Sequence, residues 1–343
     1  MLEAANTLYV TTPGAALRLD HDTVRVEVDG ATALRVPLLR LSSIVCFSAA
    51  LISPPLVERC ADDGRPIVLL DRTGAFRARI EGRLKGNVLL RRAQHVALSD
   101  GEHTERIARQ IAAGKLQNAR HVLLRGAREA RDPGDAAVLA RAAEFLTEAL
   151  VRLRDAAGLN VVRGIEGDAA RTYFRAFTAL VREDRAAFAP AGRTRRPPRD
   201  RTNALLSFLY ALLRAECESA LEGVGLDPQV GYLHALRPGR PALALDLMEE
   251  LRPVVADRLA LTLINRRQVR RDGFRELPGG AVHMDDDTRK EVLAAWQRRK
   301  QELVEHRVLG QKVPLGVVPH VQARLLARHL RRDLEHYPPF LHR

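Results

Sequence analysis

Long apolar runs, cysteines and a secretory signal are scarce or missing in this sequence of 343 residues. It has no eighteen consecutive apolar residues, the pattern typical of a helix that crosses a membrane. The three cysteines, Cys46, Cys60 and Cys217, are scattered and match neither a disulfide framework nor a zinc-binding spacing. The opening residues lack the basic and apolar regions of a secretory signal. We therefore expect a cytoplasmic protein that does not associate with membranes.

Several catalytic signatures are also absent. The chain has no Walker loop, no G-x-G-x-x-G, no G-x-S-x-G and no H-E-x-x-H. NTP hydrolysis, dinucleotide chemistry and serine hydrolysis therefore have no support. Aromatic residues make up only 4% of the chain, with Trp296 as the single tryptophan, which argues against recognition of single strands by base stacking.

Positive charge, by contrast, is abundant. Lys and Arg together number 55 against 42 Asp and Glu, for a net charge of +13, and only five of the basic residues are lysines. Because the planar guanidinium group suits phosphate, nucleic acid is the first partner to consider. An arginine bias of a GC-rich genome would give the same composition, so charge alone leaves both interpretations open.

Two patterns divide the chain into a β-rich start and a helical remainder. Alternation over Thr23–Val28 and again over 33–38, with a turn at Asp29-Gly30, predicts a hairpin. We expect further short antiparallel strands and one short helix that begins after Ser53. Apolar residues at helical spacing then predict helices over 102–130, 136–156, 164–181, 203–221, 287–306 and 319–335, with a small hairpin over 274–284.

These patterns predict an α+β fold with two segregated domains. Residues 1–84 form a small, β-sandwich-like domain with one short helix, which we interpret as a scaffold or dimerisation unit. Residues 85–343 form a larger, all-α domain that carries catalysis and DNA binding.

The segment 231–257 contains a histidine and two acids that suit a metal. His234 lies in a loop bounded by Gly and Pro, and Asp246 and Glu249, three residues apart, share one face of a helix. A hard divalent cation accepts oxygen donors and an imidazole. Asp246 and Glu249 equally match a capping box, and Arg252 could pair with Glu249 on the helix surface. The residues themselves leave these alternatives open.

Glu166 and an arginine-rich loop are two further candidates. Glu166 stands between Gly164 and Gly167 at a predicted helix start, where the helix dipole usually stabilises a carboxylate. The predicted loop 183–203 surrounds Pro197-Pro198 with arginines. We interpret it as a phosphate-contacting arm rather than a solvated connection. Its arginines are Arg193, Arg195, Arg196, Arg199 and Arg201.

Four ordered blocks resemble the CRISPR-associated protein one (Cas-one) family, the integrase-endonuclease of spacer acquisition. The blocks are GIEG followed by AA and YF within 164–174, RPPRD and NALLS within 196–207, GYLH at 231–234, and DLMEELRP at 246–253. The resemblance implies a β-rich N-terminal domain and a helical catalytic domain. It also implies a metal triad of Glu166, His234 and Glu249 that binds Mn²⁺ or Mg²⁺, with Asp246 as a further catalytic acid near the site.

The resemblance further implies an activity and partners. A metal-dependent DNA endonuclease and integrase would insert captured fragments as spacers, by attack of a 3′-hydroxyl on phosphodiesters of the CRISPR repeat. Its partners would be double-stranded DNA and CRISPR-associated protein two (Cas-two), with two homodimers bridged by a Cas-two dimer. The length and opening residues are similar to a type I system of the I-C subtype. The alternatives are a non-catalytic, basic DNA-binding scaffold and a repair nuclease that acts on branched DNA.

Overall fold

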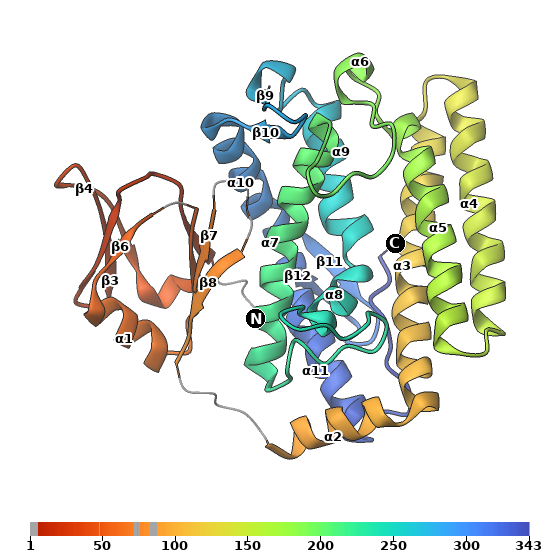
Figure 1. Cartoon of the computed structure of the whole chain (residues 1–343), viewed down its shortest axis with the longest axis horizontal. Coiled ribbons are helices and arrows are strands. Elements are labelled where there is room, and N and C mark those ends of the chain that lie inside the picture. Colours follow the sequence, from red (N-terminus) through yellow and green to blue (C-terminus); the bar gives the residue numbers. More distant parts are fainter. Residues whose placement is uncertain (1–5, 48, 72–73, 75, 83–87, 343) are drawn as a thin grey trace.

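The computed structural model describes residues 6–47, 49–71, 74, 76–82 and 88–342. It shows a β-rich N-terminal region beside a larger helical region (Figure 1), which confirms the predicted α+β fold class. The predicted boundary between residues 84 and 85 falls outside the described residues and stays a prediction. None of the helices in the described part of the chain has the length and apolarity that a bilayer crossing requires.

The N-terminal region consists of two four-stranded sheets. In the first, the strand order is β1 (Asn6–Val10), β5 (Leu41–Cys46), β7 (Ile67–Leu70) and β8 (Phe76–Ile80). In the second, it is β4 (Ala31–Pro37), β3 (Thr23–Val28), β2 (Ala16–Asp20) and β6 (Leu51–Ile52). The predicted hairpin is confirmed, because β3 and β4 pair antiparallel across Asp29 and Gly30, which both have positive φ as such a tight turn requires.

The prediction that the strands are antiparallel is wrong for three pairs. Strands β1 and β5, β5 and β7, and β2 and β6 run parallel. A parallel pair needs a crossover, and the chain supplies it by visiting the second sheet and, before β7, the helix α1 (Pro54–Asp62). Alternation within one strand reports the buried face and carries no information on the direction of its partner.

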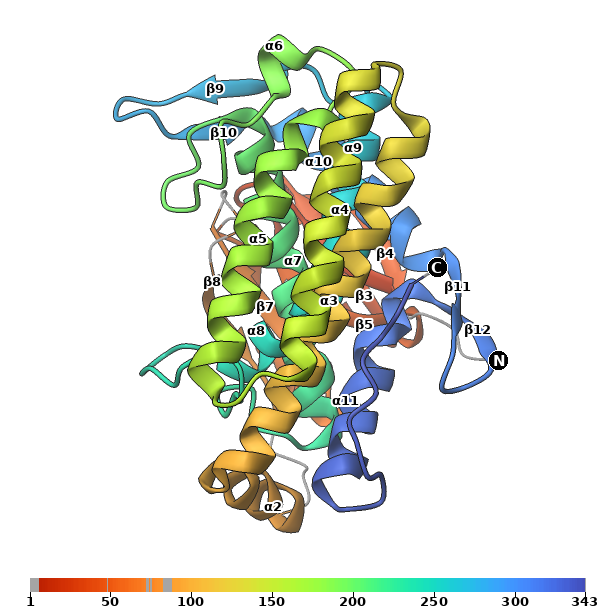
Figure 2. The same cartoon turned by 90° about the vertical axis from the view of Figure 1, so that its right-hand side faces the viewer.

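Three long helices form one layer of the helical region (Figure 2). They are α3 (Gly101–Glu129), α4 (Pro133–Arg154) and α5 (Leu159–Leu180). The side chains of Asp100 and Asp132 accept hydrogen bonds from first-turn amides of α3 and α4 and so define where these helices begin. The apolar helix α7 (Arg201–Val224), begun in the same way by Asp200, runs through the core.

Shorter elements complete the helical region. They are α2 (Val88–Ser99), α6 (Arg185–Phe188), α8 (Ala242–Glu249), a π-helical turn (Arg252–Asp257), α9 (Arg258–Asn265), the hairpin β9 (Phe274–Glu276) with β10 (Val282–Met284), α10 (Asp286–Gln301), the hairpin β11 (Leu303–His306) with β12 (Gln311–Pro314), and α11 (Val318–Leu330). Pro253 lies in this π-helical turn, which interrupts the regular helix between α8 and α9.

Two predicted helix boundaries are wrong. Helix α5 begins at Leu159, after Gly158 with φ 94°, so Glu166 lies two turns inside the helix and not at its dipolar end. Residues 303–306, predicted as the end of a helix, form strand β11. These residues form backbone hydrogen bonds with Gln311–Pro314 instead of within a helix. The spacing of apolar residues does not predict such pairing.

Candidate metal centre and nucleic-acid interface

Three elements bring the predicted triad to one point. Glu166 comes from α5, His234 from the loop after α7, and Glu249 from the last turn of α8. The ammonium of Lys115, on α3, contacts Glu166 Oε1 and lies 2.6 Å from Glu249 Oε2. His234 Nε2 lies 3.6 Å from Glu249 Oε1. Sequence positions more than eighty residues apart therefore share one small volume.

Asp246 holds the loop that carries His234. One carboxylate oxygen accepts the amides of Tyr232 and Leu233 at 2.6 and 2.9 Å, and the other accepts the amide of His234 at 2.8 Å. The second oxygen also lies 2.6 Å from His234 Nδ1. When Nδ1 carries the ring proton, the Nδ1–H group donates a hydrogen bond to this carboxylate. The other ring nitrogen, Nε2, then keeps its lone pair free on the side of Glu249 and can bind a metal ion.

The helix boundary decides between the two interpretations of Asp246. Because α8 begins at Ala242, Asp246 lies inside the helix, and the capping-box alternative is wrong. The loop also passes so close to α8 that a side chain at Gly231 would place Cβ 2.6 Å from the carbonyl carbon of Ala242. Glycine is required there by this close approach.

Charge around Glu249 keeps it ionised. Burial by itself would raise its pKa, but Arg252, at 2.8 Å, together with Lys115 and His234, holds the pKa at about 2. Burial likewise opposes the charge of Lys115, yet Glu249 and Glu166 raise the pKa of its ammonium. The pairing of Arg252 with Glu249 that the sequence suggested does occur, although in the interior and not on a helix surface.

The donor set fits a hard divalent cation in its chemistry: two carboxylates and an imidazole nitrogen. Glu249 Oε2 is buried and has no hydrogen-bond partner, and its contact with Lys115 is an ion pair without hydrogen-bond geometry. As the side chains stand, the described residues contain no group of three His, Cys, Asp or Glu gathered closely enough to hold a metal. The ammonium of Lys115 occupies the space between the two carboxylates and marks where positive charge is stabilised.

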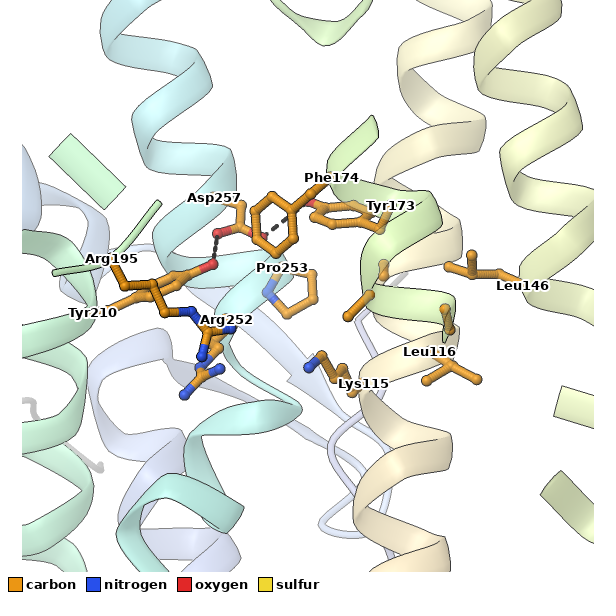
Figure 3. Close-up of a pocket in the computed structure, with 13 residues that line it drawn as sticks. Lys115, Leu116, Leu146, Tyr173, Phe174, Arg195, Tyr210, Arg252, Pro253 and Asp257 are labelled. Carbon is orange, nitrogen blue, oxygen red and sulfur yellow. Dashed lines mark hydrogen bonds between the residues drawn. The ribbon is translucent and has the colours of Figure 1, made fainter. Parts of the chain in front are cut away.

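Lys115 and Arg252 also line a small cavity, which Figure 3 shows. Asp257 lies in its wall and accepts hydrogen bonds from the hydroxyls of Tyr173, at 3.0 Å, and Tyr210, at 2.7 Å. Burial raises the pKa of Asp257 to about 6, although both hydroxyls and two nearby arginines lower it. The cavity measures about 20 Å³, which is room for about one water molecule. We interpret this cluster as a brace between α5, α7 and the π-helical turn.

His234 lies in the wall of a separate, larger hollow of about 480 Å³. The beginnings of α3 and α5 border it at Gly101 and Gly158, and Arg163 and Leu236 lie in its wall. This hollow gives His234 an approach from solvent that the small cavity does not offer.

The arginine-rich loop divides into inward and outward side chains. Arg193 is bonded to Asn203 Oδ1 at 2.7 Å and to Ser207, and burial lowers its pKa. Arg201 donates to the carbonyls of Arg271 and Ala187. The other three arginines of the predicted set, Arg195, Arg196 and Arg199, are exposed.

Two arginines that the sequence analysis did not select belong to the same surface. Arg237 and Arg240 lie in the loop that follows His234. Burial lowers the pKa of Arg240, and the charges of Arg237, Arg195 and Arg196 lower it further. Two loops therefore gather four guanidinium groups beside the centre. The available signal was the R-P-G-R sequence that begins three residues after His234.

Lys115 was also missed. Nothing in the pattern of α3 distinguishes a buried lysine that faces two carboxylates from a surface lysine. The one sign in the sequence is its rarity, since only five lysines occur among 55 basic residues.

Comparison with known proteins agrees with this architecture. The model of the family described as "CRISPR associated protein Cas1" matches residues 8–298. A CRISPR-associated endonuclease Cas1 from Moorella thermoacetica is 57% identical over 98% of this chain and 98% of its own length. Two solved structures share the fold. A casposase bound to integration product has a TM-score of 0.82 at 20% identity, over 97% of this chain and 93% of that one. A Cas6-RT-Cas1–Cas2 complex has a TM-score of 0.81 at 22% identity, over 100% of this chain and 36% of that one.

The family match spans most of the sequence and includes Glu166, His234, Asp246 and Glu249. The Moorella relative extends the likeness over nearly the whole of both chains. The chain belongs to the Cas1 family of CRISPR-associated proteins.

Proposed function

We propose that this protein is a divalent-metal-dependent DNA endonuclease and integrase that inserts captured DNA fragments into a CRISPR array. The observation that carries the proposal is that Glu166 and Glu249 meet at the ammonium of Lys115, with His234 Nε2 3.6 Å from Glu249 Oε1. Stability alone does not account for such a cluster, because a buried ion pair is often no more stabilising than apolar residues of similar volume. Clusters of this kind are typical of functional sites.

Glu166, His234 and Glu249 would hold Mn²⁺ or Mg²⁺. When bound, such an ion polarises a phosphoryl oxygen and stabilises the charge that develops on the leaving oxygen. The protein supplies the geometry. Asp246 fixes the imidazole so that Nε2 faces Glu249, and Arg252 keeps Glu249 ionised and oriented. Lys115 has a flexible side chain that can exchange its contact with the carboxylates for one with a DNA phosphate.

The nucleophile decides which reaction takes place. If water attacks the phosphodiester, the strand is cut. If the 3′-hydroxyl of a captured fragment attacks a repeat phosphodiester, a new bond from its oxygen to phosphorus forms while a repeat 3′-oxygen leaves. The number of phosphodiester bonds is conserved in this exchange, so no nucleotide hydrolysis is needed, in agreement with the absence of a Walker loop.

The outward arginines would bind the DNA backbone. Arg195, Arg196, Arg237 and Arg240 lie together beside the centre, and phosphate neutralisation by arginine gives sequence-tolerant, salt-dependent binding. We further propose that homodimers, joined through the N-terminal regions, assemble with Cas2. The shared fold with a chain of a Cas1–Cas2 complex and with a casposase on its integration product supports this assignment.

A metal-dependence assay tests the proposal. Purified protein with Mn²⁺ should cut or join DNA on a supercoiled plasmid and on a fragment-integration substrate. Glu166→Ala, His234→Ala and Glu249→Ala should each abolish turnover and leave DNA binding largely intact, whereas Glu144→Ala, on the exposed face of α4, should change neither.

Two outcomes would contradict the proposal. Activity retained in all three variants would refute the metal assignment. DNA binding that is indifferent to EDTA, with no turnover in any divalent cation, would favour the non-catalytic scaffold. A repair nuclease would use the same centre, and a preference for branched DNA over the integration substrate would identify it.

A further inference from the structure

The C-terminal segment Tyr337–His342, here called the strap, crosses the helical region next to the proposed metal centre. It follows α11 and runs beside α3, where Figures 1 and 2 place the C-terminal end. The side chains of Tyr337 and Phe340 are almost completely buried. The strap lies beyond the residues 8–298 that match the family model.

Glu250 is the first anchor of the strap, and it directly follows Glu249. Its fully buried carboxylate accepts hydrogen bonds from the hydroxyl of Tyr337 at 2.7 Å and from the amide of Phe340 at 2.7 Å. A third hydrogen bond comes from Gln322 Nε2, on α11, at 3.0 Å. The residue beside a proposed metal ligand is thus held mainly by the C-terminus of the chain.

Asn118 is the second anchor, one turn along α3 from Lys115. Its side-chain amide donates to the backbone carbonyls of Glu250, at 2.7 Å, and Phe340, at 2.8 Å. Its Oδ1 accepts the amide of His342 at 2.9 Å. Asn118 therefore ties α3, the end of α8 and the strap together, one turn from the position where Lys115 meets Glu249.

Gly114 provides the space for this crossing. A Cβ at this position would lie 2.7 Å from Cβ of Pro339, closer than such atoms approach, and in a tight contact of 3.2 Å with Cβ of Glu250. Glycine in a helix interior is destabilising relative to alanine. Helix α3 nevertheless has a glycine at Gly114, where the strap crosses it.

We propose that the strap is a positioning element of the metal centre, which sets the end of α8 against α3 and so the distance of Glu249 from Lys115 and Glu166. The inference rests on the proposed function, because the proposed cation site needs Glu249 at this place. The strap touches none of the three ligands and acts through Glu250 and Asn118. Residues that orient metal ligands in this way typically change metal affinity 10–100-fold when they are altered.

The sharpest test is Gly114→Ala. Helix propensity predicts that alanine stabilises α3, whereas the strap must be displaced to admit the methyl group. We expect Mn²⁺ to bind at least about tenfold more weakly in isothermal titration calorimetry without DNA. We also expect faster hydrogen exchange over Asp246–Asp257. Gly223→Ala is the matched control, because its Cβ meets nothing closer than 3.8 Å, and Mn²⁺ affinity should not change.

Tyr337→Phe gives a second variant that keeps the ring and removes one hydrogen bond to Glu250. It should weaken Mn²⁺ binding in the same direction as Gly114→Ala, but less. Tyr9→Phe, which removes a buried hydroxyl between Thr7 and Trp296, is its control and should leave Mn²⁺ affinity unchanged.

The outcomes separate this inference from the proposed function. A wild-type protein that takes up no Mn²⁺ overturns the metal centre and the positioning role with it. A wild-type protein that binds Mn²⁺, with both strap variants equal to it in affinity and in exchange over Asp246–Asp257, overturns the positioning role alone. Weaker Mn²⁺ binding in both variants and in neither control supports it.

Discussion

The N-terminal β-rich region and the helical region bury different kinds of side chain. Among the described residues up to Ile80, Thr7 is the only polar side chain that is buried. The helical region buries Asp246, Glu249, Glu250 and Asp257, together with several arginines, amides and histidines. Each buried carboxylate faces donors or cations from another element. The first region is held by apolar packing, whereas the second is specified by pairs of polar groups, which are costly when incomplete.

The largest effect is expected from Lys115→Met, which leaves Glu166 and Glu249 facing each other without the ammonium. Breaking a buried ion pair from one side typically costs about 3–5 kcal/mol, so the metal-free variant should unfold at a clearly lower temperature. Mn²⁺ should restore most of the loss, because a divalent cation replaces the missing charge.

Thermal unfolding with and without Mn²⁺ measures this effect. The shift caused by Mn²⁺ should be larger in Lys115→Met than in the wild type. Lys290→Met, on an exposed position of α10, should show neither change. A variant whose metal-free stability equals that of the wild type would show that the buried charges of the helical region are not mutually dependent.

The next effect concerns the apolar core of the N-terminal region. Ile44 is fully buried between its two sheets, and Ile44→Ala should lower the free energy of unfolding by about 3 kcal/mol. Hydrogen exchange should rise in β1, β5 and β7, while Mn²⁺ affinity should stay that of the wild type. Val151→Ala, exposed on α4, is the control. A coupled loss of Mn²⁺ affinity would erase the contrast between the regions.

A smaller effect depends on pH. The carboxyl of Asp257 has a folded pKa of about 6, whereas the ordinary pKa of an aspartate is 3.8. Between these values the folded protein holds the proton that the unfolded chain releases. Stability should therefore fall as pH rises from about 4 to 6, by on the order of 2 kcal/mol.

Asp257→Asn isolates that contribution, because its amide cannot ionise. Chemical denaturation from pH 4 to 7 should give a flatter stability curve for this variant than for the wild type. Asp22→Asn, on an exposed aspartate of the N-terminal region, should leave the curve unchanged. A parallel decline of wild type and Asp257→Asn would mean that Asp257 is ionised throughout.

The smallest effect belongs to the surface. Replacing Arg195 and Arg196 by Ala should weaken DNA binding and lower the slope of log affinity against log salt by about 2, close to one unit for each lost phosphate contact. Fluorescence anisotropy at several salt concentrations measures the slope. Arg141→Ala, on the exposed face of α4, should leave it as it is. An unchanged slope in the double variant would make the loop a connector.

Much of the fold was readable because local patterns agree with it. Strict alternation in Thr23–Val28 predicted a strand, and aspartates at positions 100, 132, 200 and 285 stand where helices begin. Parallel pairing could not be predicted, because it depends on contacts between segments that are far apart in the sequence. The hairpin β11–β12 could not be predicted either, because a short pattern does not decide between a strand and the end of a helix over 303–306.

The sequence by itself determined the residue types of the centre, a histidine and acids in ordered blocks, and the family that they resemble. Only the tertiary structure decided what each does in space. It placed Glu166 two turns inside α5 and Lys115 between two carboxylates. It also showed that Asp246 binds the loop that carries His234. It also brought the last residues of the chain against α8. The physical reason is that a buried charge is stable only with partners, and those partners come from elements that folding brings together.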